Sequence, residues 1–271
     1  MRLMWIGGPT TRLEIGAFRL LTDPMLGEGT EAFVMRRHPT TGALNVPIPR
    51  LTPLPHADLD DIDLVLASHL HSDHFDARAV ERLDHGIPVV APTPNVAQLR
   101  DWGFHDVTGV DWAAERVLSK PDEQLRLVTL PAHHSHDSGA NHDLGAVNGY
   151  LIEHTTPGSV FRIYWTGDTV WFDELRDIAA GLSGVDLLLA HLGGVGSTGG
   201  PWGMISLDAE EGTRVTEAVD PELVIPIHHS TYPFYVEPVG TFVRRLAASA
   251  YTGRVLVLRE GETWTSAPTG R

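Results

Sequence analysis

The ten residues ASHLHSDHFD, at positions 67–76, hold three histidines and two aspartates. In an extended segment alternate side chains share a face, so His69, His71 and Asp73 can point the same way, while His74 turns to another side. Imidazole and carboxylate groups at this spacing suit two neighbouring metal ions better than one. They favour Zn²⁺, with Mn²⁺ or Fe as alternatives. A chance group of polar residues in a surface loop explains a lone His-x-His pair, but it explains this denser pattern poorly.

Four further apolar runs end in residues of the same kind. His133 and His134 follow LVTLPA, Asp168 follows FRIYWTG, His191 follows LLLA, and His228 and His229 follow LVIPI. Such apolar runs are typical of strands that are buried on both faces. Strand ends on one edge of a sheet converge on one place, so the five runs predict a single ligand cluster.

Predicted strands and helices alternate along the chain, and they form two halves in which strands precede helices. The strands include 13–23, 63–68 and 254–260, and the helices fall in 75–86, 93–103, 171–181, 207–219 and 239–250. The Pro-rich segment 38–59 predicts an extended loop, and the Gly-rich segment 192–204 predicts a mobile or tightly turning one. No clear linker separates the halves, so we expect one domain over residues 1–271.

The composition is that of an ordinary globular protein, with 42% apolar and 20% charged residues in a chain of 271. The chain has no cysteine, which excludes disulfides and thiolate metal ligands. Its net charge of −15 disfavours binding to a nucleic-acid backbone. No stretch reaches the roughly 18 apolar residues of a membrane span, and the start lacks a signal-peptide core. We therefore expect a cytoplasmic protein with a small-molecule substrate and no membrane span; the sequence does not indicate its oligomeric state.

The sequence HLHSDH, followed in order by PAHH, TGD and PIHH, resembles the motif set of the metallo-β-lactamase superfamily. The resemblance runs from about Leu3 to Leu258. It implies an α+β fold, a four-layer αββα sandwich with a dinuclear site at one edge. LLTDP, NGYLIE and IPIHHSTY look most like the branch that includes ascorbate-6-phosphate lactonase and the phospholipase D acting on N-acyl-phosphatidylethanolamine.

The resemblance also implies which side chains hold the two metal ions. The first ion is expected at His69, His71 and His134, the second at Asp73, His74 and His228, with Asp168 bridging both. PAHH and PIHH each contain two histidines, and one of each pair is the expected metal ligand. The register of the branch favours His134 over His133, and His228 over His229.

Other polar residues near these motifs have several open roles. His191 and His229 are candidates for protonating the leaving group, although a structural role for His191 is about as plausible. His229 stands where many relatives have an aromatic residue, so substrate contact and support of a ligand are also open to it. Asp23 is expected to support the ligands or to cap a turn, and Asp76 to do likewise or to cap the helix that it begins.

The expected chemistry is metal-dependent hydrolysis of an ester, lactone, amide or phosphodiester bond. Two metal ions can supply hydroxide at neutral pH, which Asp73 would orient, and no side-chain nucleophile is needed. The absence of cysteine and of a G-x-S-x-G sequence agrees with this. The alternatives are a non-catalytic metal-binding scaffold or sensor, and a nuclease or phosphodiesterase that acts on nucleic acid. Flavodiiron proteins share the scaffold but have Glu at the position of His71, which disfavours redox chemistry.

Overall fold

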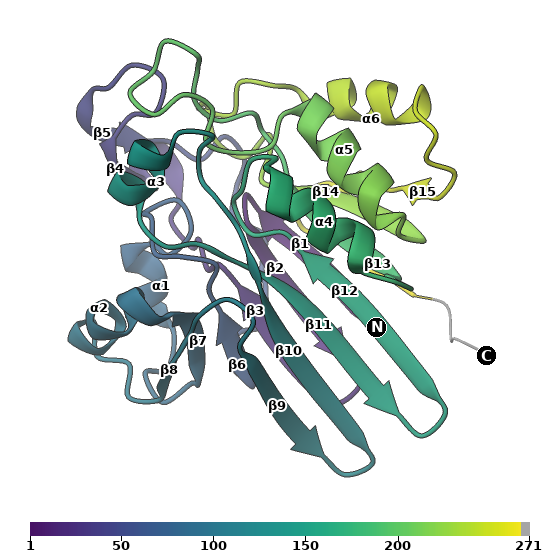
Figure 1. Cartoon of the computed structure of the whole chain (residues 1–271). Helices are drawn as coiled ribbons and strands as arrows, with labels where there is room; N and C mark the ends of the chain where they lie inside the picture. The colour runs from purple at the N-terminus through teal and green to yellow at the C-terminus, as the bar shows by residue number, and fades with distance from the viewer. Residues whose placement is uncertain (267–271) are drawn as a thin grey trace.

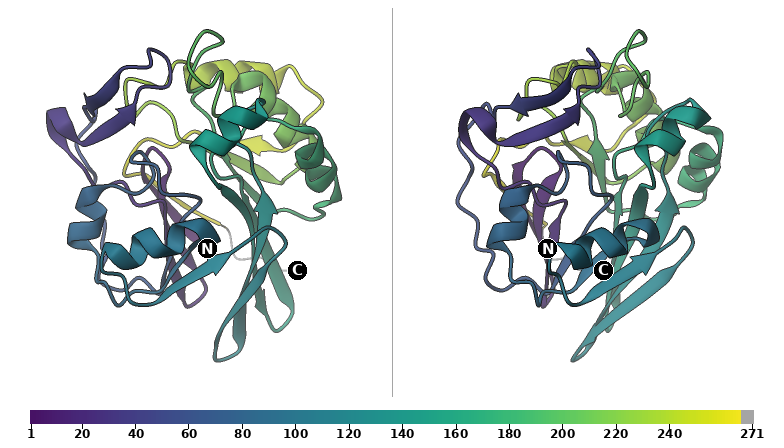
Figure 2. Two further views of the ribbon diagram at one scale, coloured as in Figure 1. Left: turned by 60° about the vertical axis from the view of Figure 1, so that its left-hand side comes forward. Right: turned by 90° about the vertical axis from the view of Figure 1, so that its left-hand side faces the viewer.

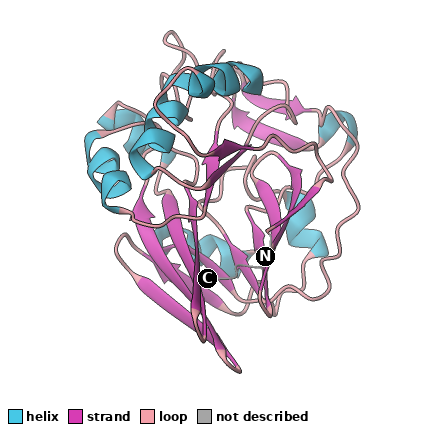
Figure 3. Ribbon diagram, turned by 90° about the vertical axis from the view of Figure 1, so that its right-hand side faces the viewer, coloured by secondary structure: helices cyan, strands magenta, loops and turns pink. Residues whose placement is uncertain are grey.

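The computed structural model describes residues 1–266, in which two β-sheets pack face to face and helices cover the outer side of each (Figures 1 and 3). This arrangement confirms the predicted α+β fold with αββα layers. In residues 1–266, no helix has both the length and the apolar character that a membrane span requires.

Seven strands form each of the two large sheets. The first sheet has the order β16-β1-β2-β3-β6-β7-β8, with β16 (Thr263–Thr265), β1 (Arg2–Gly7), β2 (Thr10–Ile15), β3 (Phe18–Thr22), β6 (Leu64–Leu66), β7 (Val89–Pro92) and β8 (Val107–Val110). The second has the order β15-β14-β13-β12-β11-β10-β9, with β15 (Arg254–Val255), β14 (Leu223–Ile227), β13 (Leu187–His191), β12 (Ser159–Trp165), β11 (Asn148–Thr156), β10 (Glu123–Pro131) and β9 (Glu115–Lys120).

The helices fall into two outer layers and a cap. The outer helices are α1 (Ala77–Arg82) and α2 (Val96–Asp101) on the first sheet, and α4 (Asp173–Gly181), α5 (Ala209–Val219) and α6 (Val239–Ala247) on the second. A two-stranded hairpin of β4 (Phe33–Arg37) and β5 (Leu44–Ile48) lies at the same end of the molecule as α3 (Ser138–Leu144) (Figure 2). Short 3-10 turns occur at Gly29–Glu31 and Thr93–Asn95.

Three apolar clusters hold the layers together. The cluster between the sheets draws on both of them, with Trp5 and Leu20 from the first and Tyr150 and Trp165 from the second. The other two clusters join each sheet to its own helices. Strands β13 and β14 are buried along their whole length, because both faces of this parallel part of the sheet are covered.

The predicted elements differ from the observed ones at several places. The run 13–23 is two strands, β2 and β3, with a turn at Gly16 and Ala17, and only Arg254–Val255 of the run 254–260 is a strand. The segment 38–59, predicted as a loop, contains β5, whose pairing with β4 is not encoded in an apolar pattern because most of its residues are exposed. Segment 192–204 has no helix or strand, as predicted.

Asp76 caps α1, as one of its two predicted roles requires. Its Oδ1 accepts a hydrogen bond from Ala79 N at 2.7 Å. Its Oδ2 accepts from Leu26 N at 2.9 Å and from Gly27 N at 2.6 Å. The carboxylate therefore fixes the start of the helix against the segment that follows β3.

A buried ion pair connects three distant parts of the chain. Arg50 Nη2 donates to Glu260 Oε2 and to Ile6 O, both at 2.6 Å, and the side chains of Arg50 and Glu260 are 0% and 9% exposed. Glu260 Oε1 also accepts from Thr231 Oγ1 at 2.8 Å. The pair thus ties the segment before β6 and the chain after β15 to the loop after β14.

Removing the arginine of this pair should destabilise the fold strongly. We expect Arg50→Leu to lower the free energy of unfolding by about 3–5 kcal/mol, because it leaves the Glu260 carboxylate buried without its cation. Urea denaturation would measure the change. Adding Glu260→Leu should recover part of the loss, and Arg78→Leu, at an exposed pair with Glu81, should leave stability unchanged. Equal stability of Arg50→Leu and the unmodified chain would contradict this reading.

Candidate metal centre

The predicted ligands lie together where strands of both sheets end. His69 follows β6 of the first sheet, whereas His134, Asp168 and His228 follow β10, β12 and β14 of the second. The expectation that one edge of one sheet would carry the cluster is therefore corrected. The five strands contribute from two sheets, and the face-to-face packing of those sheets brings their ends together.

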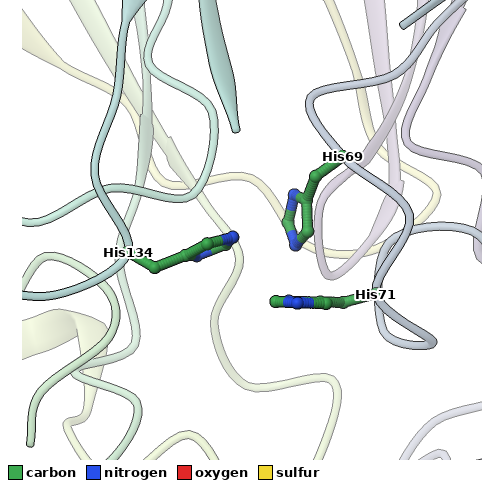
Figure 4. Close-up of side chains that lie close together, drawn as sticks. All are labelled: His69, His71 and His134. Carbon is green, nitrogen blue, oxygen red and sulfur yellow. The ribbon is translucent and has the colours of Figure 1, made fainter. Parts of the chain in front are cut away.

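Three histidines form the first group, and their rings turn toward one another (Figure 4). The candidate ligand atoms of His69, His71 and His134 lie within 4.8 Å of one another. The ring centroids are 4.4 Å apart for His69 and His71, 4.5 Å for His69 and His134, and 4.7 Å for His71 and His134. This geometry could hold one metal ion between three imidazoles.

Asp73, His74 and His228 form a second group with the same 4.8 Å limit between candidate ligand atoms. Asp168 lies between the two groups. Its Oδ2 is 3.7 Å from His74 Nε2 and 3.7 Å from His134 Nδ1. The structure therefore brings all seven predicted ligands into one continuous cluster, in which the Asp168 carboxylate lies near a histidine of each group.

In three of the candidate ligand histidines, one ring nitrogen has a hydrogen-bond partner and the other has none in the described chain. Nδ1 of His69 contacts Ser68 Oγ at 2.9 Å, Nδ1 of His74 contacts Asp23 Oδ2 at 2.7 Å, and Nδ1 of His228 contacts Leu192 O at 2.9 Å. Nε2 of each ring is buried and has no hydrogen-bond partner among residues 1–266. Metal-binding histidines commonly have this arrangement, in which the other nitrogen is fixed by a hydrogen bond.

Two further ligands have buried atoms without a partner, and His71 differs from the other histidines. Its Nε2 contacts Leu144 O at 2.8 Å, which leaves Nδ1 for a metal ion. Both nitrogens of His134 and Oδ1 of Asp168 are buried without a partner in the described part of the chain. Buried polar groups in proteins are nearly always hydrogen-bonded or bound to an ion. The donor set therefore fits divalent metal ions.

The electrostatics of the cluster put the ligands in the required protonation states. Burial lowers the pKa of His71 to about 4 and that of His134 to about 3, so both imidazoles are neutral at pH 7. Burial raises the pKa of Asp73 and of Asp168 to about 6, so both carboxyl groups are predominantly ionised at pH 7. Neutral imidazole and ionised carboxylate are the forms that bind metal.

Strained backbone positions surround the cluster. Asp23 and His228 have φ values of 33° and 60°, which non-glycine residues adopt rarely. Gly167, which precedes Asp168, has φ 64°, and a Cβ there would overlap the carbonyl oxygen of Asn148. The TGD sequence thus needs its glycine in order to direct Asp168. Strain of this kind concentrates at functional sites, where the surrounding structure holds it in place.

Asp23 supports ligands of both groups. Its Oδ1 accepts from Ser68 N at 2.7 Å, and its Oδ2 accepts from Ser68 Oγ at 2.6 Å and contacts His74 Nδ1. Because the Ser68 hydroxyl donates to Asp23, it accepts from His69 Nδ1. Sequence patterns do not predict the roles of Ser68 and of the Leu144 carbonyl, because a hydroxyl and a main-chain oxygen have no distinctive spacing.

The two predicted proton donors lie beside the cluster and are buried. His191 Nδ1 is 3.3 Å from Thr166 Oγ1, and its Nε2 is 3.9 Å from Asp23 Oδ2. The ring of His229 lies 4.6 Å from that of Trp5, and its Nδ1 contacts Ser230 Oγ at 2.8 Å.

His133, the histidine set aside in favour of His134, is stacked between two aromatic rings. Its centroid is 5.4 Å from that of Trp112 and 4.1 Å from that of Phe172. His133 is in none of the possible metal-binding groups of the described residues, whereas His134 is in one.

The chain is similar to known proteins over nearly its whole length. Residues 19–229 match the family model of the beta-lactamase superfamily domain. An N-acyl-phosphatidylethanolamine-hydrolyzing phospholipase D of Caenorhabditis elegans is 27% identical over 252 residues, which are 86% of this chain and 66% of that protein. The chain also spans 66% of the length of three mycobacterial relatives that are 28% identical.

Two further matches concern a named hydrolase and a solved structure. A metal-dependent hydrolase of Pyrococcus horikoshii is 27% identical over 208 residues, which are 76% of this chain and 82% of that protein. The crystal structure of an isothiocyanate hydrolase from Delia radicum gut bacteria superposes with a TM-score of 0.79 at 20% identity, covering 98% of this chain and 99% of that one, and this shows the shared fold. The chain belongs to the metallo-β-lactamase superfamily, and the class predicted from its sequence, metal-dependent hydrolase, is also the class named for its Pyrococcus horikoshii relative.

Proposed function

We propose that this chain is a hydrolase that binds two divalent metal ions, with Zn²⁺ favoured by the donor set. The observation that carries the proposal is the row of buried imidazole nitrogens without partners, arranged as two groups around Asp168. His69, His71 and His134 would hold the first ion, and Asp73, His74 and His228 the second. Asp168 would bridge them.

The reaction class follows from this donor set. When bound, two such ions lower the pKa of a shared water and polarise the bond to be cleaved. Asp73, ionised at pH 7, accepts a hydrogen bond from the attacking water and orients it. His191 and His229 are the candidates for the leaving-group proton. His191 Nδ1 lies 3.3 Å from Thr166 Oγ1, whereas its Nε2 is buried without a hydrogen-bond partner in the described chain. His191 also groups with Asp23 and His74 as possible metal ligands, so a supporting role and proton donation are both open to it.

The bond that is cleaved is an ester, lactone, amide or phosphodiester. The relative from Pyrococcus horikoshii is named a metal-dependent hydrolase and the one from Caenorhabditis elegans a phospholipase D, so these names support a hydrolase and leave the substrate open. A metal-binding scaffold without turnover is the alternative, and the same experiments separate the two.

Loss of one ligand should remove metal and activity together. We expect His69→Ala and Asp168→Asn to bind less zinc and to lose roughly 1,000-fold in hydrolysis, the equivalent of the several kcal/mol that a metal ion supplies. Mass spectrometry of bound metal and a panel of lactones, esters, amides and phosphodiesters would measure both effects. His105→Ala, at an exposed histidine, is the matched control. Hydrolysis that persists after the metal is lost would contradict the mechanism, and full zinc binding without any hydrolysis would favour the scaffold.

Asp23→Asn should weaken metal binding without unfolding the protein. An amide cannot accept from Ser68 and His74 through both of its atoms, so the rings of His69 and His74 lose their fixed orientation. Loss of such a supporting group typically costs about 10- to 100-fold in metal affinity. Competition with a chromophoric chelator would measure the zinc dissociation constant. Asp101→Asn, at an exposed aspartate in α2, should leave it unchanged, and an unchanged constant in Asp23→Asn would refute the supporting role.

A further inference from the structure

Tyr235 lies against the second ligand group, and no sequence motif points to it. Its ring centroid is 4.8 Å from that of His228, with an angle of 66° between the planes. Its hydroxyl oxygen is buried and has no hydrogen-bond partner among residues 1–266. A buried phenol normally finds a partner, and Tyr235 combines a hydroxyl without one with a ring that contacts the ligand His228, so a bound substrate could supply the missing partner.

Two glycines make room for this side chain. A Cβ on Gly8 would lie 3.2 Å from Tyr235 Oη, and a Cβ on Gly193 would lie 2.8 Å from Tyr235 Cδ1. Gly8 O also accepts a hydrogen bond from His228 N at 2.7 Å. The same backbone segment therefore positions the ligand histidine and accommodates the tyrosine beside it, so the position of the hydroxyl relative to His228 is fixed by the fold.

Burial is the main influence on the Tyr235 hydroxyl, whose ring lies beside the second ligand group. Burial raises the pKa of Tyr235 well above its usual value, and smaller contributions come from Tyr232, Asp73 and Asp168. The two carboxylates belong to the second ligand group and to the expected bridge. A tyrosine hydroxyl carries its proton at neutral pH in its ordinary state, so it can act as a hydrogen-bond donor.

We propose that the Tyr235 hydroxyl donates a hydrogen bond to the carbonyl or phosphoryl oxygen of the substrate, beside the group of Asp73, His74 and His228. This inference rests on the proposed function, since it adds a substrate-binding donor to the same site. It makes Tyr235 a residue that contacts the substrate, rather than one that fills space under the β4–β5 hairpin. A site that offers such a donor selects substrates with an acceptor oxygen on the bond that is cleaved.

Tyr235→Phe tests the proposal, because it removes only the hydroxyl. We expect zinc content and Tm to stay as in the unmodified protein, while kcat/KM for the best substrate of the panel falls about 10- to 100-fold, as for loss of a hydrogen bond to a charged or developing oxygen. Tyr164→Phe is the matched control. Its hydroxyl is also buried without a partner in the described chain, but its ring packs in the cluster between the second sheet and the helices. It should leave kcat/KM unchanged.

A second readout does not depend on turnover. Inorganic phosphate, titrated calorimetrically into the zinc-loaded protein, should bind about tenfold more weakly to Tyr235→Phe than to Tyr164→Phe. Equal phosphate affinities of the two variants at full zinc content would overturn the proposal, as would a zinc-loaded protein that binds no phosphate. Weaker phosphate binding in Tyr235→Phe without hydrolysis of any panel compound would support the donor and refute the hydrolase. Failure of the unmodified chain to bind zinc would refute the proposed function itself.

Discussion

The carboxylate of Asp23 is the contact on which the geometry of the candidate metal centre depends. It is fully buried, a position that strongly disfavours a charged group, and burial raises its pKa well above the usual value. Hydrogen bonds from the main chain and hydroxyl of Ser68 oppose that shift. Through Ser68 it orients His69, and through its own Oδ2 it orients His74. One side chain at the end of β3 therefore sets the ring directions of a histidine in each ligand group.

The rest of the cluster requires the two sheets to be packed in one relative position. His69, His71, Asp73 and His74 come from the first sheet's side, whereas His134, Asp168 and His228 come from the second. The large inter-sheet core, with Trp5 and Trp165, fixes this relation by apolar packing. The cluster itself contributes buried nitrogens without partners, which oppose folding until a cation satisfies them. Metal binding and the stability of the sheet packing are therefore linked.

Much of this centre could be predicted from the sequence because its ligands follow strands with strong apolar patterns. The order of HLHSDH, PAHH, TGD and PIHH identified seven side chains that the structure brings together, and the αββα layers followed from the same motifs. The sequence could not show that two sheets share the cluster, since local patterns carry no information on which strands pair. β5 was missed because an exposed hairpin strand lacks an apolar face. Ser68, Leu144 and Tyr235 were missed because their roles depend on contacts between distant segments.

The candidate ligands and the segments that cover them come from different kinds of structure in this fold. The candidate ligands follow buried strands of the two large sheets, whereas the segments beside them build a separate apolar cluster. Val46 of the hairpin, Leu144, Trp202 and Tyr235 pack partly buried around one separate cluster next to the centre, and Arg37 lies 5.1 Å above the Trp202 ring. Connecting segments of this kind vary more readily among related proteins than strands do. The family match ends at residue 229, before Tyr235. Membership of the superfamily therefore accounts for the ligand set, and the side chains that distinguish substrates must be sought in the segments that cover it.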